Sequence, residues 1–324
     1  MMDSEPTRLA SLAALNRRSR ERGYELEDID WSQPIARDSL WAPEHTGTLY
    51  YLPIYEELTV AEKLRYNQLT GLGICEQFIY LEENAIIRPM ARMLQRAELP
   101  LSLRESLCHF IREEEKHTAM FWRLLKLCEP GWYTRSRYRL CRVSPFQQLA
   151  FGQTARYPDI FLVWLWAALF VEERSLWVSR EYLRARKDCA GVDEMITRVH
   201  EYHLKDEVRH CQLDHHLIRQ FYDHRPRWKK LLCAFSLRQL LRGYISTKRT
   251  TERILQVLSD EFPRLRSRIG PEAKRQLATV GGNLRFQKAM YGERVVPRML
   301  RLLAERSEYD GIWDLLPAVE RRGG

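Results

Sequence analysis

The sequence has few of the features that mark secreted, membrane-spanning or β-rich proteins. Its seven cysteines are scattered without a CxxC pair, which argues against a disulfide framework or a thiolate zinc site and fits a reducing cytoplasm. The longest apolar run, Ile160–Val171, has 12 residues and is too short to cross a bilayer. The N-terminus shows no signal-peptide pattern. Only 15 glycines and 14 prolines occur in 324 residues, which argues against a β-sandwich.

The composition is that of an ordinary globular protein with an uneven charge. The chain is 45% hydrophobic and 29% charged, with a net charge of +9, and it can bury a sizeable core. From Arg225 onward, 22 basic residues face 10 acidic ones. These basic residues are interspersed with apolar ones as in solvated amphipathic helices. No nucleic-acid motif is present, so we expect neither a nucleic-acid nor a membrane partner. The basic residues leave an acidic carrier protein or an anionic substrate as a possible partner.

Apolar spacing and capping residues predict an all-α chain with four long helices. The first is expected over 59–97, opened by a capping box of Thr59 and Glu62 and bent at Pro89. The others are expected at about 103–128, 160–186 and 192–222. Two pairs of long helices joined by a long connection are typical of a ferritin-like four-helix bundle.

We expect these helices to form a single domain with two additions. Residues 1–58 are predicted to be an N-terminal arm with a short helix, and residues 59–225 to be the bundle. Residues 226–324 are predicted to be a basic helical extension packed on the bundle. Three or four shorter helices are expected there, separated at Pro263, Gly270-Pro271, Gly281-Gly282 and Gly292.

Two copies of one motif carry the chemistry. Glu113–His117 and Asp206–His210 both read [DE]-E-x-x-H. Residues three apart share a helix face, so the second acid and the histidine of each motif can coordinate one metal ion. Two such hits among nine histidines would arise by chance in roughly one chain in a hundred. A surface salt-bridge ladder explains one motif better than two.

A glutamate inside an apolar helix precedes each motif. Glu83 lies 31 residues before Glu114, and Glu173 lies 34 residues before Glu207. Burying an acidic side chain in such a segment costs free energy unless the acid is paired or binds metal. One glutamate from each of two helices, plus Glu-x-x-His from each of the other two, is the ligand set of carboxylate-bridged di-iron or di-manganese bundles. Zinc fits this thiolate-free set less well. His203 lies on the same face as Glu207 and is predicted to be a further ligand.

Three segments resemble motifs of the p-aminobenzoate N-oxygenases (AurF-like), non-haem di-iron enzymes that oxidise amines. Residues 83–89 are similar to the family's Glu-x-x-Ile-x-x-Pro, which selects Glu83 over Glu82. Residues 203–210 are similar to its His-Leu-x-Asp-Glu-x-x-His, and residues 171–173 to its Val-x-Glu, which selects Glu173 over Glu172. The resemblance covers about residues 60–225. It implies seven metal ligands: Glu83, Glu114, His117, Glu173, His203, Glu207 and His210.

The resemblance also implies a role for each of these side chains. Glu114 and Glu207 would bridge two irons, and Glu83 and Glu173 would be terminal ligands. One iron would take His117, and the other His203 and His210. Asp206 and Glu113 would accept N–H bonds from the ligand imidazoles and so fix their tautomers.

The activity implied is oxygen transfer to an amine. The reduced iron pair would bind dioxygen as a peroxo-diferric species and convert an aryl or amino-acid-derived amine, free or carrier-tethered, to a hydroxylamine, nitroso, oxime or nitro product of specialised metabolism. A separate reductase or ferredoxin is required, because no flavin or nicotinamide fingerprint is present. Side chains one turn from the predicted ligands would line the substrate pocket: Tyr80, Phe170, Leu176 and Trp177. A homodimer stays open.

Three other functions fit parts of this pattern. The same ligands could serve a di-iron C-hydroxylase or desaturase, and the extra histidine, His203, favours nitrogen over carbon. A ferritin-like iron-binding protein would share the fold, but the length of the chain and the asymmetry at His203 weigh against it. A helical scaffold without metal would leave buried acids unpaired, which is expensive.

Overall fold

The computed structural model describes residues 9–95, 98–134, 137–245 and 248–320. Within these ranges the structure is built of α-helices joined by 3₁₀ and π turns, and it contains no β-strand. The predicted all-α, ferritin-like class is confirmed.

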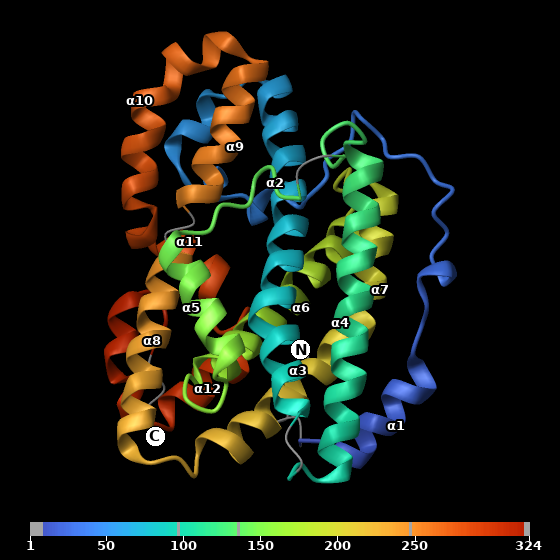
Figure 1. Ribbon diagram of the computed structural model, residues 1–324. Coiled ribbons are helices and arrows are strands. Elements are labelled where there is room, and N and C mark those ends of the chain that lie inside the picture. The colour runs from blue at the N-terminus through green and yellow to red at the C-terminus, as the bar shows by residue number, and fades with distance from the viewer. Residues whose placement is uncertain (1–8, 96–97, 135–136, 246–247, 321–324) are drawn as a thin grey trace.

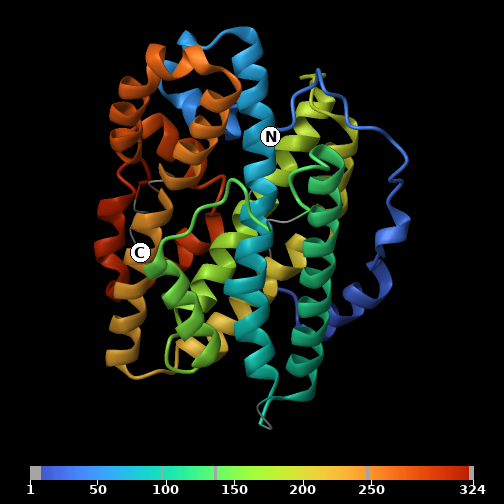
Figure 2. The same ribbon diagram turned by 45° about the horizontal axis from the view of Figure 1, so that its top comes forward.

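Four long helices form a bundle. They are α2 (Val60–Leu81), α4 (Leu101–Cys128), α6 (Val163–Lys187) and α7 (Glu194–Leu217). Helix α2 packs on α4, α6 packs on α7, and α4 and α7 join the two pairs. Figure 1 and Figure 2 show the long connection between α4 and α6, which crosses the outside of the bundle.

The first long helix departs from regular geometry at its end. Its predicted start is confirmed, because the Thr59 hydroxyl accepts from the Glu62 N–H while the Glu62 carboxylate accepts from the Thr59 N–H. The predicted bend takes the form of a π-helical turn, Glu82–Ile87, followed by α3 (Arg88–Leu94). Because Pro89 has no N–H and its ring clashes with the carbonyl of Ala85, the wider turn absorbs the mismatch.

One helix was not expected from the sequence. Helix α5 (Pro145–Arg156) lies in the connection between α4 and α6, and it packs on α3 and α6. Its signal is a second capping box, in which Ser144 and Gln147 bond each other's backbone N–H groups. Pro145, at the first helical position, adds to that signal.

The described part of the C-terminal extension holds five helices rather than three or four. They are α8 (Arg227–Ile245), α9 (Lys248–Glu261), α10 (Pro263–Thr279), α11 (Leu284–Tyr291) and α12 (Pro297–Ala304). The predicted break at Gly270-Pro271 is wrong, since α10 continues through it. Leu265, Ile269, Ala273 and Leu277 are buried along one face of α10, and this burial holds the helix together across the lost hydrogen bond.

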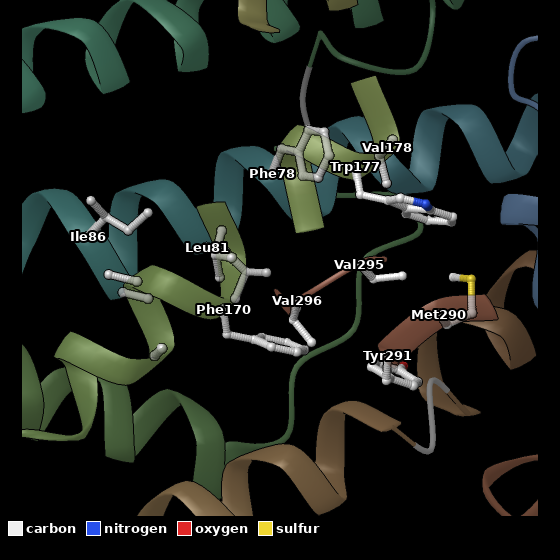
Figure 3. Close-up of a cluster of buried hydrophobic side chains, with 14 of the residues drawn as sticks. Phe78, Leu81, Ile86, Phe170, Trp177, Val178, Met290, Tyr291, Val295 and Val296 are labelled. Carbon is white, nitrogen blue, oxygen red and sulfur yellow. The ribbon is translucent and has the colours of Figure 1, made fainter. Parts of the chain in front are cut away.

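The extension and the first helix of the N-terminal arm cover opposite sides of the bundle, whereas residues 48–57 of the arm pack on α10 and α11 of the extension. Helices α8 to α12 lie on the α2 and α6 side, while α1 (Leu12–Arg22) packs on α4 and α7 (Figure 1). Figure 3 shows the apolar cluster where the extension meets the bundle, with Phe170 near Val296 and Tyr291. In the described part of the chain, no helix is both long and apolar enough to cross a membrane.

Candidate metal centre

Four side chains from α4 and α7 converge inside the bundle. They are Glu114, His117, Glu207 and His210, each at most 1% exposed. One ligand atom from each lies within 4.8 Å of those from the others. The shortest contact joins His210 Nδ1 to Glu114 Oε1 at 2.8 Å. The second acid and the histidine of each [DE]-E-x-x-H motif therefore share one space.

A second group adjoins the first. Glu82, His117 and His203 form another cluster of possible metal ligands. His203 Nε2 lies 3.6 Å from Glu82 Oε1 and 3.0 Å from Glu207 Oε1. On the other side of the site, Glu172 Oε2 lies 3.1 Å from His210 Nδ1. The site thus gathers four carboxylates and three imidazoles from α4, α6, α7 and the π-helical turn that extends α2.

The predicted choice of Glu83 over Glu82 does not agree with the structure. Glu82 is 2% exposed and lies in the site, whereas Glu83 forms an ion pair with Arg137 and accepts from the Tyr138 hydroxyl at 3.3 Å. The reason is helical phase, because neighbouring residues point about 100° apart. Glu83 therefore faces the segment that follows α4.

The choice of Glu173 over Glu172 is overturned in the same way. Glu173 is buried but lies outside the site, where its carboxylate accepts the backbone N–H groups of Arg298 and Met299 at 2.8 and 2.9 Å. These N–H groups belong to the first turn of α12 and have no partner within that helix. Glu173 is the N-terminal cap of α12.

The implied pairing of His203 with His210 also differs from the structure. His203 lies seven residues before His210 on α7, which places it roughly 10 Å farther along the axis. It sits beside His117, with ring centroids 4.5 Å apart. The structure therefore groups His203 with His117 and Glu82, and His210 with Glu114 and Glu172.

The first acid of each motif bonds the histidine of the other motif. Asp206 Oδ2 lies 3.1 Å from His117 Nε2, and Glu113 Oε2 lies 2.9 Å from His210 Nε2. The Arg209 guanidinium donates to both acids. An N–H···carboxylate bond at Nε2 turns Nδ1 of each ring toward the centre of the site. These are the positions implied for Asp206 and Glu113.

His203 is oriented by a hydrogen bond to a hydroxyl group rather than to a carboxylate. Its Nδ1 lies 3.0 Å from Ser179 Oγ, which lies 3.2 Å from Nδ1 of His200. Burial, with His203 nearby, lowers the pKa of His200 well below its ordinary value. His200 is therefore neutral and stacks on Tyr182 at 3.7 Å. The Nε2 of His203 is left facing Glu82 and Glu207.

Buried polar atoms without hydrogen bonds meet at the centre of this site. In the described part of the chain they include both oxygens of Glu114, His117 Nδ1, His203 Nε2 and Glu207 Oε1. Such atoms are costly to bury without full hydrogen bonding. Here their close contacts are ion pairs with neighbouring site residues, such as His210 Nδ1 to Glu114 Oε1 at 2.8 Å and His203 Nε2 to Glu207 Oε1 at 3.0 Å. When all four carboxylates are ionised, they carry the charge that two divalent cations balance. Oxygen and imidazole donors without thiolate suit a pair of first-row ions, so the residues fit a dinuclear metal site.

Protonation reflects the same crowding of acids. Burial and the neighbouring Glu114 raise the pKa of Glu82 to about 7. Burial opposes the charging of His203, but Glu207 and Glu82 outweigh it and raise the pKa to about 10. Burial likewise opposes ionisation of Glu207, yet His203 and His210 hold its pKa well below the ordinary value. Imidazolium charge thus balances carboxylate charge, and a metal would displace these protons.

Several site residues were not found from the sequence, although spacing offered a signal. Glu172, Ser175 and Ser179 lie three and seven residues apart on α6, and both serines bond α7 site residues. Asp214, one turn beyond His210, is a further buried carboxylate with neither oxygen hydrogen-bonded among the described residues. Asp214 lies four residues after His210 and seven after Glu207, so its spacing places it on the same face of α7.

The predicted substrate pocket is only partly assembled. Tyr80 and Phe170 line a pocket of about 90 Å³, together with Leu81 and Val171, which directly precede Glu82 and Glu172. Leu176 and Trp177 do not line it. Figure 3 shows Trp177 in the apolar core, and the centroid of its ring lies 6.1 Å from that of the His45 ring.

Comparisons with known proteins identify a family for the chain and several structures of similar fold. A family model described as P-aminobenzoate N-oxygenase AurF matches residues 5–268. None of the curated proteins compared with the chain matches it. Among solved structures, a tyrosine variant of an R2-like ligand-binding oxidase with an aerobically reconstituted Mn/Fe cofactor is 16% identical, with a TM-score of 0.47. A glycine variant with an anaerobically reconstituted cofactor is 17% identical, with a TM-score of 0.46. In both cases the match covers 85% of this chain and 93% of the other.

Proposed function

Because the chain belongs to the p-aminobenzoate N-oxygenase AurF family, we propose that it is a di-iron oxygenase that oxidises a substrate amine with dioxygen. The observation that carries the proposal is the convergence of buried carboxylate and imidazole atoms from Glu114, His117, His203 and Glu207, which lack full hydrogen bonding. Two irons would be held by these residues with Glu82, Glu172 and His210. When bound, such a pair supplies the electrons and the Lewis acidity that activate dioxygen.

The protein's own contribution is to position and protect the site. Asp206 and Glu113 hold two imidazoles with Nδ1 inward, and Ser179 holds the third with Nε2 inward. Arg209 and Lys116 neutralise the two outer acids, so that their charge does not add to that of the inner carboxylates. All seven inward side chains are at most 2% exposed, which keeps bulk water from the reacting atoms.

The proposal requires partners from outside the chain. An external reductase or ferredoxin must supply electrons, because the sequence carries no flavin or nicotinamide fingerprint. The amine is an aryl or amino-acid-derived molecule, either free or attached to an acidic carrier protein. The product is a hydroxylamine, nitroso, oxime or nitro compound.

The test combines metal analysis with product mass. Purified protein reconstituted with iron(II) is expected to hold two irons per chain. Turnover of an amine library with reductant and ¹⁸O₂ is expected to raise the mass of one amine class by incorporated heavy oxygen on nitrogen. A Glu114→Gln, Glu207→Gln double variant is the control. Heavy oxygen found on carbon would indicate a hydroxylase, and iron uptake without any product would indicate a storage protein.

A further inference from the structure

Two pockets beside the metal centre share one wall. The first, already described, is called the head pocket. The second, called the tail pocket, has a volume of about 220 Å³ and lies among α5, the start of α6 and α8. Five residues line both pockets: Ala85, Gln147, Phe151, Ala167 and Leu240. The two pockets are therefore neighbouring parts of one elongated site, with these five residues at the neck.

The tail pocket is apolar. Ten of its fourteen lining residues have apolar side chains. Of its polar residues, Thr154 bonds its own helix carbonyl and Gln147 caps α5. Phe146 and Leu149, which line the pocket, are 64% and 61% exposed. Apolar surface of this kind is stabilised when an apolar group covers it.

The head pocket carries positive charge. Arg142 and Arg249 line it, and none of its lining residues is acidic. Arg142 donates to the carbonyl oxygens of Tyr138 and Cys141, and neither arginine forms an ion pair within the described ranges. A guanidinium without a carboxylate partner is suited to bind an anionic group of a ligand.

We propose that the two pockets together bind an amphiphilic anion, with its apolar chain in the tail pocket and its acidic group against Arg142 and Arg249. The substrate class would then be an amine that carries an acidic group and an apolar chain. Its reacting part lies in the head pocket, which Leu81 and Val171 border next to Glu82 and Glu172. The substrate class rests on the proposed function, whereas binding of the anion does not.

Binding is tested on metal-free full-length protein by displacement of dansyl-labelled undecanoate. Decanoate is expected to bind at least about tenfold more tightly than butanoate, because its longer chain buries more apolar surface. Decanol and decylammonium are expected to bind more weakly than decanoate, because they lack the negative group. Equal affinity for decanoate and butanoate would overturn the assignment of the apolar chain to the tail pocket. Equal affinity for decanoate and decanol would overturn the assignment of the acidic group to the head pocket.

Variants locate the binding. Leu240→Trp fills the neck and is expected to weaken decanoate binding by about tenfold, with little effect on butanoate. Leu231→Trp, on an exposed part of the same helix, is the matched control. Ser236→Trp, which lines only the tail pocket, repeats the test if Leu240→Trp fails to fold by circular dichroism. Unchanged decanoate affinity in a folded neck or tail variant would overturn the proposal.

The acidic group is located separately. The double variant Arg142→Gln, Arg249→Gln is expected to weaken the binding of decanoate but not that of decanol, with Arg242→Gln as the control.

Sedimentation is measured in parallel, since a second copy of the chain covering Phe146 and Leu149 would exclude the probe and overturn the proposal. In the iron-loaded enzyme, 2-aminodecanoate is expected to be oxidised in preference to decylamine. Binding without oxidation of any amine would refute the proposed function and leave the anion site standing.

Discussion

The adjacent acids Glu172 and Glu173 give the sharpest test of the site. Glu172 lies 3.1 Å from His210 Nδ1, and Glu173 caps α12 through two backbone N–H groups. Replacing either by glutamine keeps the shape of the side chain and removes one ionisable group. We expect Glu172→Gln to impair metal binding with little effect on the metal-free fold, and Glu173→Gln to do the reverse.

The sizes of both effects follow from the contacts. Glutamine at position 173 offers one carbonyl oxygen to two buried N–H groups, and an unsatisfied buried donor costs about 1–3 kcal/mol. With an unfolding entropy of about 2.1 cal/mol/K per residue, Glu173→Gln lowers Tm by roughly 1.5–4 °C. An ion present at about a hundred times its Kd adds about 2.7 kcal/mol, or roughly 4 °C. Two ions should raise the Tm of the wild-type protein by roughly 8 °C, and that of Glu172→Gln by at most half as much.

The assay is calorimetry of metal-free and iron(II)-loaded protein under nitrogen, with metal content measured on the same samples. Glu173→Gln should start from a lower Tm, gain as much as the wild-type protein on loading and hold two irons. Loss of an iron from Glu173→Gln, with both retained in Glu172→Gln, would refute the placement of these two acids.

Three further predictions concern other parts of the structure. The pKa of Glu62 is lowered, because the Thr59 N–H and Arg268 outweigh its burial; its stabilising effect is therefore present above the unfolded pKa and lost as pH falls through the folded one. Glu62→Gln should destabilise by about 1 kcal/mol at neutral pH, and a urea-unfolding difference that persisted in acid would contradict this. Glu76 accepts four hydrogen bonds from the 133–141 segment, so Glu76→Gln should cost at least about 2 kcal/mol by urea titration. His203→Ala should retain iron but lose amine oxidation by mass analysis, and unchanged turnover would exclude His203 as a ligand.

The long helices and the motif acids and histidines could be predicted because their signals are local. The Thr59–Glu62 capping box marks the start of α2, and each [DE]-E-x-x-H motif contains its own helical spacing. Helix α5 was not predicted, although Ser144 and Gln147 carry a similar box, because the longer apolar run that follows it is the stronger helix signal. The continuation of α10 through Pro271 depends on tertiary burial, which a local breaker signal does not report.

Choosing between adjacent acids needed information that the local sequence does not contain. Residues 163–175 of α6 are all buried, so hydrophobic periodicity identifies no inward face there. On α2 a signal did exist, because Glu76 and Glu83 lie seven residues apart and therefore share a face. The structure shows which face this is, because Glu76 contacts Tyr133 and Leu140 and Glu83 contacts Tyr138.

The C-terminal extension helps to set the direction of Glu172. Neighbouring helical residues point about 100° apart, so the bonds that hold Glu173 on α12 also fix the rotation of α6 that turns Glu172 toward His210. Helix α12 spans Pro297–Ala304, which lies beyond the residues 5–268 matched by the family model. The same logic holds at the other pair, where Arg137 and Tyr138 engage Glu83 and leave Glu82 to the site. In each pair of adjacent glutamates, one acid anchors a segment outside the bundle, and that anchor orients the acid that faces the metal centre.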